Sequence, residues 1–254
     1  ARLVIAGAVL HLILIQPNHP AAMTPRALLM VPLELPAILA TLAALPPRAA
    51  LTRLVRVSLV TVLAIIALLK LADYATFLAY GRAFNVAVDP YLLPAAWRLA
   101  AGALGPVPAV VALFGGVVAI ALAVAAVWWA TGAWAALTLR GAGRAATGVV
   151  AAGAVALAVA EIGHATGAWR LPAAPPGAAF TARVGLERAV AFRATRTELA
   201  AFDRAAGRDP VVPGARMLDR LDRDVLIVFV ESYGRASLDA PRYAQAIHET
   251  LRES

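Results

Sequence analysis

The sequence has 254 residues, 61% of them hydrophobic and 15% charged, with a formal net charge of +8 and no cysteine. A soluble domain is usually about half apolar and about a quarter charged, so the composition favours a membrane protein. The lack of cysteine excludes disulfides and thiolate metal sites. Because long apolar runs are present, the excess of basic residues indicates basic cytoplasmic loops that face anionic membrane lipid. It does not indicate a nucleic-acid partner.

Five apolar runs approach or reach the length of about 20 residues that a helix needs to cross a bilayer. They are Leu3–Ile15, Ala27–Leu45, Leu54–Tyr80, Val107–Leu139 and Ala145–His164. We interpret the first as a helix whose beginning precedes Ala1. The sequence therefore predicts a mainly α, polytopic membrane domain of about five transmembrane helices over residues 1–165.

The fourth and fifth runs raise separate questions. Val107–Leu139 is longer than one crossing needs, so it either forms one long helix or breaks at Gly115–Gly116 and crosses twice. Trp128 near its end favours one helix with an aromatic belt at the membrane boundary. The fifth run is dense in alanine and glycine, which predicts a helix at the centre of the bundle.

Arginine sets the expected orientation. The loops after the second and fourth runs, together with the N-terminus, carry Arg2, Arg48, Arg53, Arg56, Arg140 and Arg144. The alternate loops carry Arg26, Arg82, Arg98 and Asp89. This modest bias predicts a cytoplasmic N-terminus and an extracytoplasmic C-terminal part.

A juxtamembrane linker is predicted over residues 166–222. Leu171–Gly177 is rich in proline and cannot continue a helix. Arg183–Arg208 then predicts an amphipathic helix whose partial apolar anchors are Leu186, Val190, Leu199 and Phe202. It is either a solvated connection or a helix lying on anionic headgroups.

Residues 223–254 predict the start of an α/β domain. Val225–Val230 is an unbroken apolar run typical of a strand buried on both faces. Asp239 and Pro241 favour a helix start soon after it. Because ligands of open α/β sheets bind at the carboxyl ends of strands, Glu231 is a candidate ligand of a hard cation. The alternative is that Glu231 ends the strand and pairs with Arg235.

The stretch Asp224-Val-Leu-Ile-Val-Phe-Val-Glu-Ser-Tyr-Gly-Arg235 resembles the first strand of the sulfatase-like catalytic domain of the alkaline phosphatase superfamily. It is similar in particular to lipoteichoic acid synthases and lipid A phosphoethanolamine transferases, where membrane helices also precede the catalytic domain. The resemblance implies that Glu231 binds a divalent metal, Mn²⁺, Mg²⁺ or Zn²⁺. It also implies a site outside a bacterial-type cytoplasmic (inner) membrane.

The same resemblance implies that the nucleophile and the other metal ligands lie beyond Ser254. Ser232 and Ser237 are therefore poor nucleophile candidates, and this stretch alone should be inactive. The expected function is a metal-dependent hydrolase or phospho-headgroup transferase acting on a lipid headgroup or on a sulfate or phosphate ester. The alternative is a non-enzymatic membrane protein, either a transporter or a scaffold, with a small extracytoplasmic tail.

Several polar residues of the membrane region share the predicted outward side: Lys70, Asp73, Arg82, Asp89, Glu161 and His164. Lys70 and Asp73 are three residues apart, which predicts an ion pair on one helix face. Glu161 and His164 have the spacing of half a carboxylate-bridged metal site, although an interhelical role is the simpler interpretation. A third interpretation is that these residues together form a patch that receives a lipid headgroup.

Overall fold

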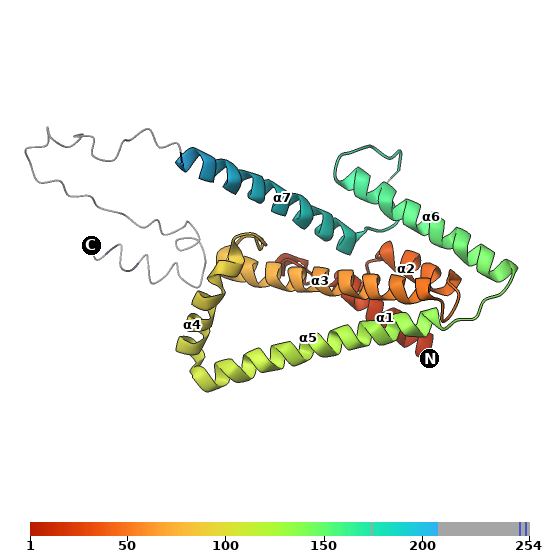
Figure 1. Cartoon of the computed structure of the whole chain (residues 1–254), viewed down its shortest axis with the longest axis horizontal. Helices are drawn as coiled ribbons and strands as arrows, with labels where there is room; N and C mark the ends of the chain where they lie inside the picture. Colours follow the sequence, from red (N-terminus) through yellow and green to blue (C-terminus); the bar gives the residue numbers. More distant parts are fainter. Residues whose placement is uncertain (174, 208–248, 250–251, 253–254) are drawn as a thin grey trace, which may run out of the picture.

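A computed structural model of the chain describes residues 1–173, 175–207, 249 and 252. Most of these residues are helical (Figure 1). The α-helices are α1 (Arg2–Ile15), α2 (Glu34–Ala44), α3 (Ala50–Tyr80), α4 (Leu93–Leu104), α5 (Pro106–Ala135), α6 (Ala142–Ala165) and α7 (Phe180–Ala206), and the 3₁₀ helices are η1 (Pro20–Ala22), η2 (Pro25–Leu29) and η3 (Asp89–Leu92). The predicted strand Val225–Val230 and Glu231 lie outside the described residues.

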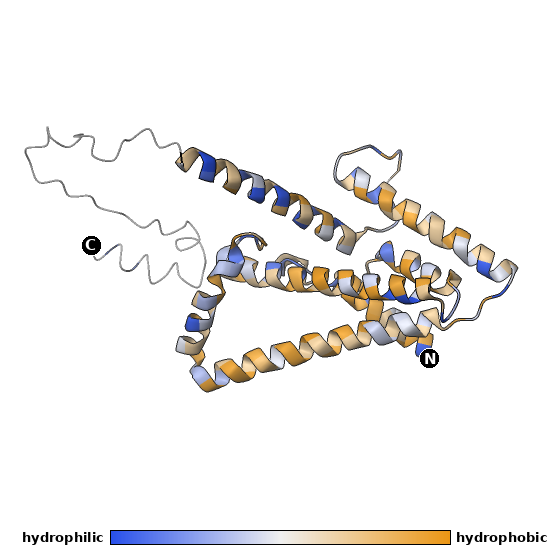
Figure 2. Cartoon of the chain, viewed as in Figure 1, coloured by the Kyte–Doolittle hydropathy of each residue, from blue (hydrophilic) through white to orange (hydrophobic). Residues whose placement is uncertain are grey.

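Three of the described helices, α3, α5 and α6, are long and apolar enough to cross a membrane. In Figure 2 these helices are mostly drawn in the orange shades of hydrophobic residues. The helices in the first two predicted runs are shorter, with 14 residues in α1 and 11 in α2. The structure therefore supports three of the five expected crossings by length and composition, and α1 and α2 do not reach that length.

The second run was predicted as one span, Ala27–Leu45, and this prediction was wrong. The chain forms η2, is extended at Met30, and becomes α-helical only at Glu34. Pro32 explains the break, because proline disfavours the helical conformation in the residue before it and has no N–H to donate. Pro36 does not interrupt α2, since it lies in the first helical turn, where its missing donor is tolerated.

The fourth run forms one helix, as the tryptophan positions favoured. α5 continues through Gly115 and Gly116 without a break. The short helix α4, which precedes α5, was not predicted. It begins with Pro94 in its first turn and ends at Gly105, where φ is +87°. These residues are ordinary helix start and stop signals, but this stretch, which contains Arg98, was interpreted as a loop.

The main apolar core lies between α1, α3 and α5. Leu10 and Leu14 of α1 are fully buried against Leu63 of α3 and Ala130 of α5. α6 packs chiefly on α2 and lies apart from α1 and α5 (Figure 1). The prediction that α6 occupies the bundle centre was therefore wrong. Its small residues form a close contact with a single neighbour.

α7 is the most hydrophilic of the long helices in Figure 2. It agrees closely with the predicted helix Arg183–Arg208, but its predicted apolar anchors do not pack: Leu186, Val190, Leu199 and Phe202 are all exposed. The docked residues are Thr181 and Val184, which are buried, and Gly185. A Cβ on Gly185 would lie 2.9 Å from Ile66 of α3, so the glycine permits the close approach of the two helices.

Candidate functional site

A buried lysine joins three helices at the start of α7. The ammonium of Lys70 in α3 donates to the carbonyl of Leu14 and to Oγ1 of Thr181, both at 2.9 Å. Leu14 lies in the last turn of α1, where backbone carbonyls have no partner within the helix and the dipole is negative. Lys70, which is 1% exposed, thus satisfies the C-terminal end of α1.

Glu34 accepts hydrogen bonds from the N-terminal end of α7, whereas Lys70 donates to the C-terminal end of α1. Its Oε1 accepts hydrogen bonds from the backbone N–H groups of Thr181, at 2.7 Å, and of Ala182, at 2.9 Å. These groups belong to the first turn of α7, whose amides have no acceptor within the helix. Glu34 is also the first residue of α2. One carboxylate therefore lies at the positive ends of two helices, a favourable position for a negative charge.

Glu161 completes the attachment of α7. Its Oε2 accepts from the amide of Ala179, the residue before α7, at 3.0 Å, and its Oε1 lies 3.3 Å from a guanidinium nitrogen of Arg183. His164 has a different role, since its Nδ1 accepts from the amide of Leu171 in the following loop, at 3.2 Å. Each member of the predicted Glu161–His164 pair thus binds a different backbone segment. We call Glu34, Lys70, Glu161, Thr181 and Arg183 the Lys70 cluster.

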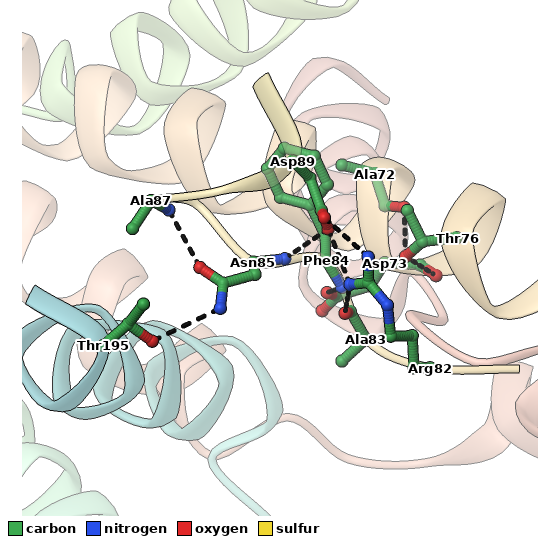
Figure 3. Close-up of polar contacts among 10 residues, drawn as sticks. All are labelled: Ala72, Asp73, Thr76, Arg82, Ala83, Phe84, Asn85, Ala87, Asp89 and Thr195. Atoms are coloured by element: carbon green, nitrogen blue, oxygen red, sulfur yellow. Dashed lines mark hydrogen bonds and ion pairs between the residues drawn. The ribbon is translucent and has the colours of Figure 1, made fainter. Parts of the chain in front are cut away.

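A second polar group surrounds Asp73, which is fully buried in α3. Its Oδ1 accepts from the amide of Phe84 at 2.9 Å (Figure 3). Its Oδ2 lies 3.1 Å from Nη2 of Arg188 in α7, close enough for an ion pair although not aligned as a hydrogen bond. The predicted Lys70–Asp73 ion pair is absent from the described residues, because each side chain has partners on other segments.

The loop after α3 is closed by a bidentate ion pair, shown in Figure 3. Arg82 donates to both carboxylate oxygens of Asp89, at 2.8 and 2.6 Å, and the amide of Asn85 donates to the same carboxylate at 2.7 Å. These bonds, chiefly those from Arg82, hold the pKa of Asp89 below its ordinary value. The Asn85 side chain in turn donates to Thr195 of α7 at 3.3 Å. We call Asp73, Arg82, Asn85, Asp89 and Arg188 the Asp73 cluster.

The charges of α3 lie toward the two ends of an apolar stretch. Between Arg56 and Lys70, about 21 Å apart at about 1.5 Å per residue, the helix has no charged residue. The outer charges Arg53 and Asp73 are about 30 Å apart along the helix, close to the thickness of the hydrocarbon core. Both polar clusters therefore lie toward one boundary of the apolar part of α3.

Two cavities open beside these clusters. One of about 250 Å³ is lined by Gln16, Lys70, Arg183 and Glu187, among others. Lys70 lines this cavity, and the carbonyl of Leu14 and Oγ1 of Thr181 accept from two of the three N–H donors of its ammonium. The other cavity, of about 200 Å³, is lined by Arg82 and Arg188. Both offer cationic donors suited to a phosphate oxygen.

The predicted polar patch is thus divided. Lys70 and Glu161 lie in the Lys70 cluster, Asp73, Arg82 and Asp89 lie in the Asp73 cluster, and His164 lies in neither. Sequence reasoning missed Glu34 and Arg183, and it missed the three α7 residues that contact α3 and its following loop, which are Thr181, Arg188 and Thr195. A usable signal was present: Thr181, Arg188 and Thr195 are spaced by seven, which places them on one helix face.

Among the described residues, no group of three or more histidine, aspartate or glutamate side chains is placed to hold a metal ion. Glu231, the predicted metal ligand, lies outside these residues. By the length and apolar character of α3, α5 and α6, the fold defines the chain as a helical membrane protein. No protein-family model, curated protein or solved structure matches it.

Proposed function

We propose that this chain anchors and positions a metal-dependent, sulfatase-like hydrolase or phospho-headgroup transferase at the outer side of the cytoplasmic membrane. The catalytic part would begin with the predicted strand Val225–Val230. Glu231 would supply one carboxylate ligand for Mn²⁺, Mg²⁺ or Zn²⁺. The resemblance of Asp224–Arg235 to the sulfatase-like first strand is the basis for the chemistry.

The observation that supports an anchoring role is the attachment of α7. Buried charges hold its first turn through Glu34 and Glu161, and Asp73 holds its middle through Arg188. A flexible linker would not need these buried contacts. A helix fixed at both points gives the segment that follows it a defined starting position and direction relative to the membrane helices.

The cavity beside Lys70 supports a lipid headgroup as the substrate class. Lys70 and Arg183 lie at the boundary of the apolar part of α3, where the headgroup of a membrane lipid resides. A phosphodiester there would lie beside the Lys70 ammonium and a guanidinium that is 37% exposed. The membrane helices would then present the lipid as well as anchor the domain.

The experiment combines metal binding with turnover, using the full-length protein in phospholipid nanodiscs. Mn²⁺ binding is followed by electron paramagnetic resonance, and headgroup release or transfer by mass spectrometry of the lipids. Glu231→Gln is expected to weaken Mn²⁺ binding by at least about 100-fold, because loss of an outer-shell partner alone costs about 10–100-fold. Glu198→Gln, an exposed glutamate of α7, is the matched control and should bind Mn²⁺ as the parent does.

The outcomes separate the two classes of function. Mn²⁺ binding that is equal in the parent and in Glu231→Gln would remove Glu231 from the metal site. Absence of Mn²⁺ binding and of any change in the lipids, in a folded full-length protein, would favour the non-enzymatic scaffold. Metal-dependent turnover with loss in Glu231→Gln alone would support the enzyme.

A further inference from the structure

A large basic cavity lies at the opposite end of α3 from the two polar clusters. Its volume is about 670 Å³, within the range of about 300–1,000 Å³ typical of small-molecule sites. The first two turns of α3 and the loop before it supply Arg48, Arg53 and Arg56. The end of α5 and the residues after it supply the facing wall, including Trp128 and Gly132.

Within the described residues, no carboxylate forms an ion pair with these arginines. None of the residues that line the cavity is acidic. Residues 1–165 contain four acids, and all four are occupied elsewhere: Glu34, Asp73, Asp89 and Glu161 bind the segments described above. None of the ion pairs within the described residues includes an arginine of this cavity. The arginines of this cavity are therefore available to an anion from outside the described part of the chain.

Arg56 is the fixed member of the group. Its Nη2 donates to the carbonyl of Trp128 at 2.9 Å, and its guanidinium carbon lies 4.1 Å from the centre of the Trp128 ring. A cation stacked on an aromatic ring in this way is held in place and remains able to donate from its other nitrogens. Its Nε is buried without a hydrogen-bond partner.

The adjacent helix end adds donors of the same kind. α3 begins at Ala50, and no side chain caps it. The amides of its first turn have no acceptor within the helix, and Ala49 and Thr52 beside them line the cavity. Three guanidinium groups, a helix N-terminus and a tryptophan at the membrane boundary together suit a phosphate group held at the level of lipid headgroups.

We propose that this cavity binds the phosphate group of an anionic ligand, independently of the function proposed for the other end of the chain. Arg53 and Arg56 would contact the phosphate oxygens and Trp128 would keep Arg56 in position. The same chemistry could be supplied by an anionic phospholipid of the bilayer or by a water-soluble phosphate ester. The experiment distinguishes these two sources.

The test measures binding of phosphatidylglycerol and phosphatidylcholine to the full chain by native mass spectrometry from a neutral detergent. The double variant Arg53→Gln/Arg56→Gln is expected to bind phosphatidylglycerol about 25-fold more weakly, taking about five-fold for each lost contact. Arg26→Gln/Arg98→Gln removes the same charge from exposed positions elsewhere and should bind within two-fold of the parent. Equal weakening of phosphatidylglycerol binding in both double variants would overturn the proposal. It would mean that the lipid is attracted by the overall positive charge and not by this cavity.

A steric variant tests the cavity without removing a charge. A Cβ added to Gly132 would lie 2.7 Å from Nη2 of Arg56, so Gly132→Ala should displace the guanidinium and weaken binding. Gly115→Ala in the same helix meets nothing within 4 Å and is the control. Unchanged binding in Gly132→Ala, together with unchanged binding in the arginine double variant, would place the ligand elsewhere.

Competition identifies the source of the phosphate. Displacement of phosphatidylglycerol by millimolar glycerol 3-phosphate would support the site with a soluble ester as its ligand. Selective retention of phosphatidylglycerol over phosphatidylcholine, undisturbed by glycerol 3-phosphate, would support it with a lipid ligand. Equal binding of the two lipids by the parent, with no effect of glycerol 3-phosphate, would refute a phosphate-ester site.

Discussion

The attachment of α7 through Glu34 makes a quantitative prediction. Glu34→Ala removes the acceptor of two amides, those of Thr181 and Ala182. A buried donor left without a partner costs about 1–3 kcal/mol, which gives about 2–6 kcal/mol for the pair. Glu34 is itself partly exposed, so water can replace part of the lost bonding. The lower end, about 2 kcal/mol, is the appropriate expectation for the weakening of α7 docking.

The absence of cysteine from the sequence makes the assay direct. Val184 lies on the docked face of α7 and is 8% exposed, whereas Val190 of the same helix is 59% exposed. A single cysteine at position 184 reacts with a maleimide only when α7 leaves α3, and one at position 190 reacts at all times. Since 1.4 kcal/mol corresponds to a factor of ten, Glu34→Ala should raise the labelling rate at position 184 by about 30-fold.

Two controls fix the interpretation. Glu34→Gln keeps an oxygen acceptor but loses the charge, so its labelling rate should lie between those of the parent and Glu34→Ala. Glu198→Ala alters an exposed glutamate of α7 remote from position 184 and should leave the rate unchanged. A rate at position 184 that stays within three-fold of the parent in folded Glu34→Ala protein would refute the capping argument.

Two further changes test the Asp73 cluster by thermal unfolding in detergent. Asp73→Asn leaves Arg188, which is 15% exposed, without its counterion and should destabilise the protein by about 3 kcal/mol, whereas a loss under about 0.5 kcal/mol would contradict the ion pair. Asp89→Asn should cost about 1 kcal/mol at neutral pH, a value reduced because Arg82 is 47% exposed. The lowered pKa of Asp89 means that its contribution is present above the ordinary carboxyl pKa and is lost as the pH falls through the folded value. The parent should therefore lose more stability than Asp89→Asn between pH 7 and pH 3, and parallel losses would contradict the assignment.

The long helices could be predicted from the sequence because one property determines them. α3, α5 and α6 each contain a long apolar run, and in a bilayer such runs must be helical to satisfy their backbone. The prediction of one helix over the second run was wrong because it gave the apolar composition more weight than the helix-breaking proline. Pro32 ends any helix that precedes it, and the helix after it was left with 11 residues.

The partners of the polar residues could not be predicted in the same way. Spacing along one helix suggested an ion pair between Lys70 and Asp73. Spacing cannot show that the end of another helix lies beside one of these side chains. Lys70 binds the end of α1, and Asp73 binds a loop amide and α7. A helix terminus carries unsatisfied backbone groups whatever its sequence, so only the three-dimensional arrangement shows which side chain meets it.

The same reasoning explains why the two ends of α3 differ in character. At the Lys70 end, each buried charge meets a helix terminus or an opposite charge, although Lys70 and Arg183 line one cavity and Arg82 and Arg188 line another. At the other end, the arginines have no acid in the described chain to meet, and one of them is held by Trp128 beside an uncapped helix start. Arg56 also has a buried Nε without a hydrogen-bond partner, which is costly, so an anion beside its remaining guanidinium nitrogens would stabilise this arrangement. The arginines that predicted the orientation of the chain are, on this argument, also its best-defined site for an anion.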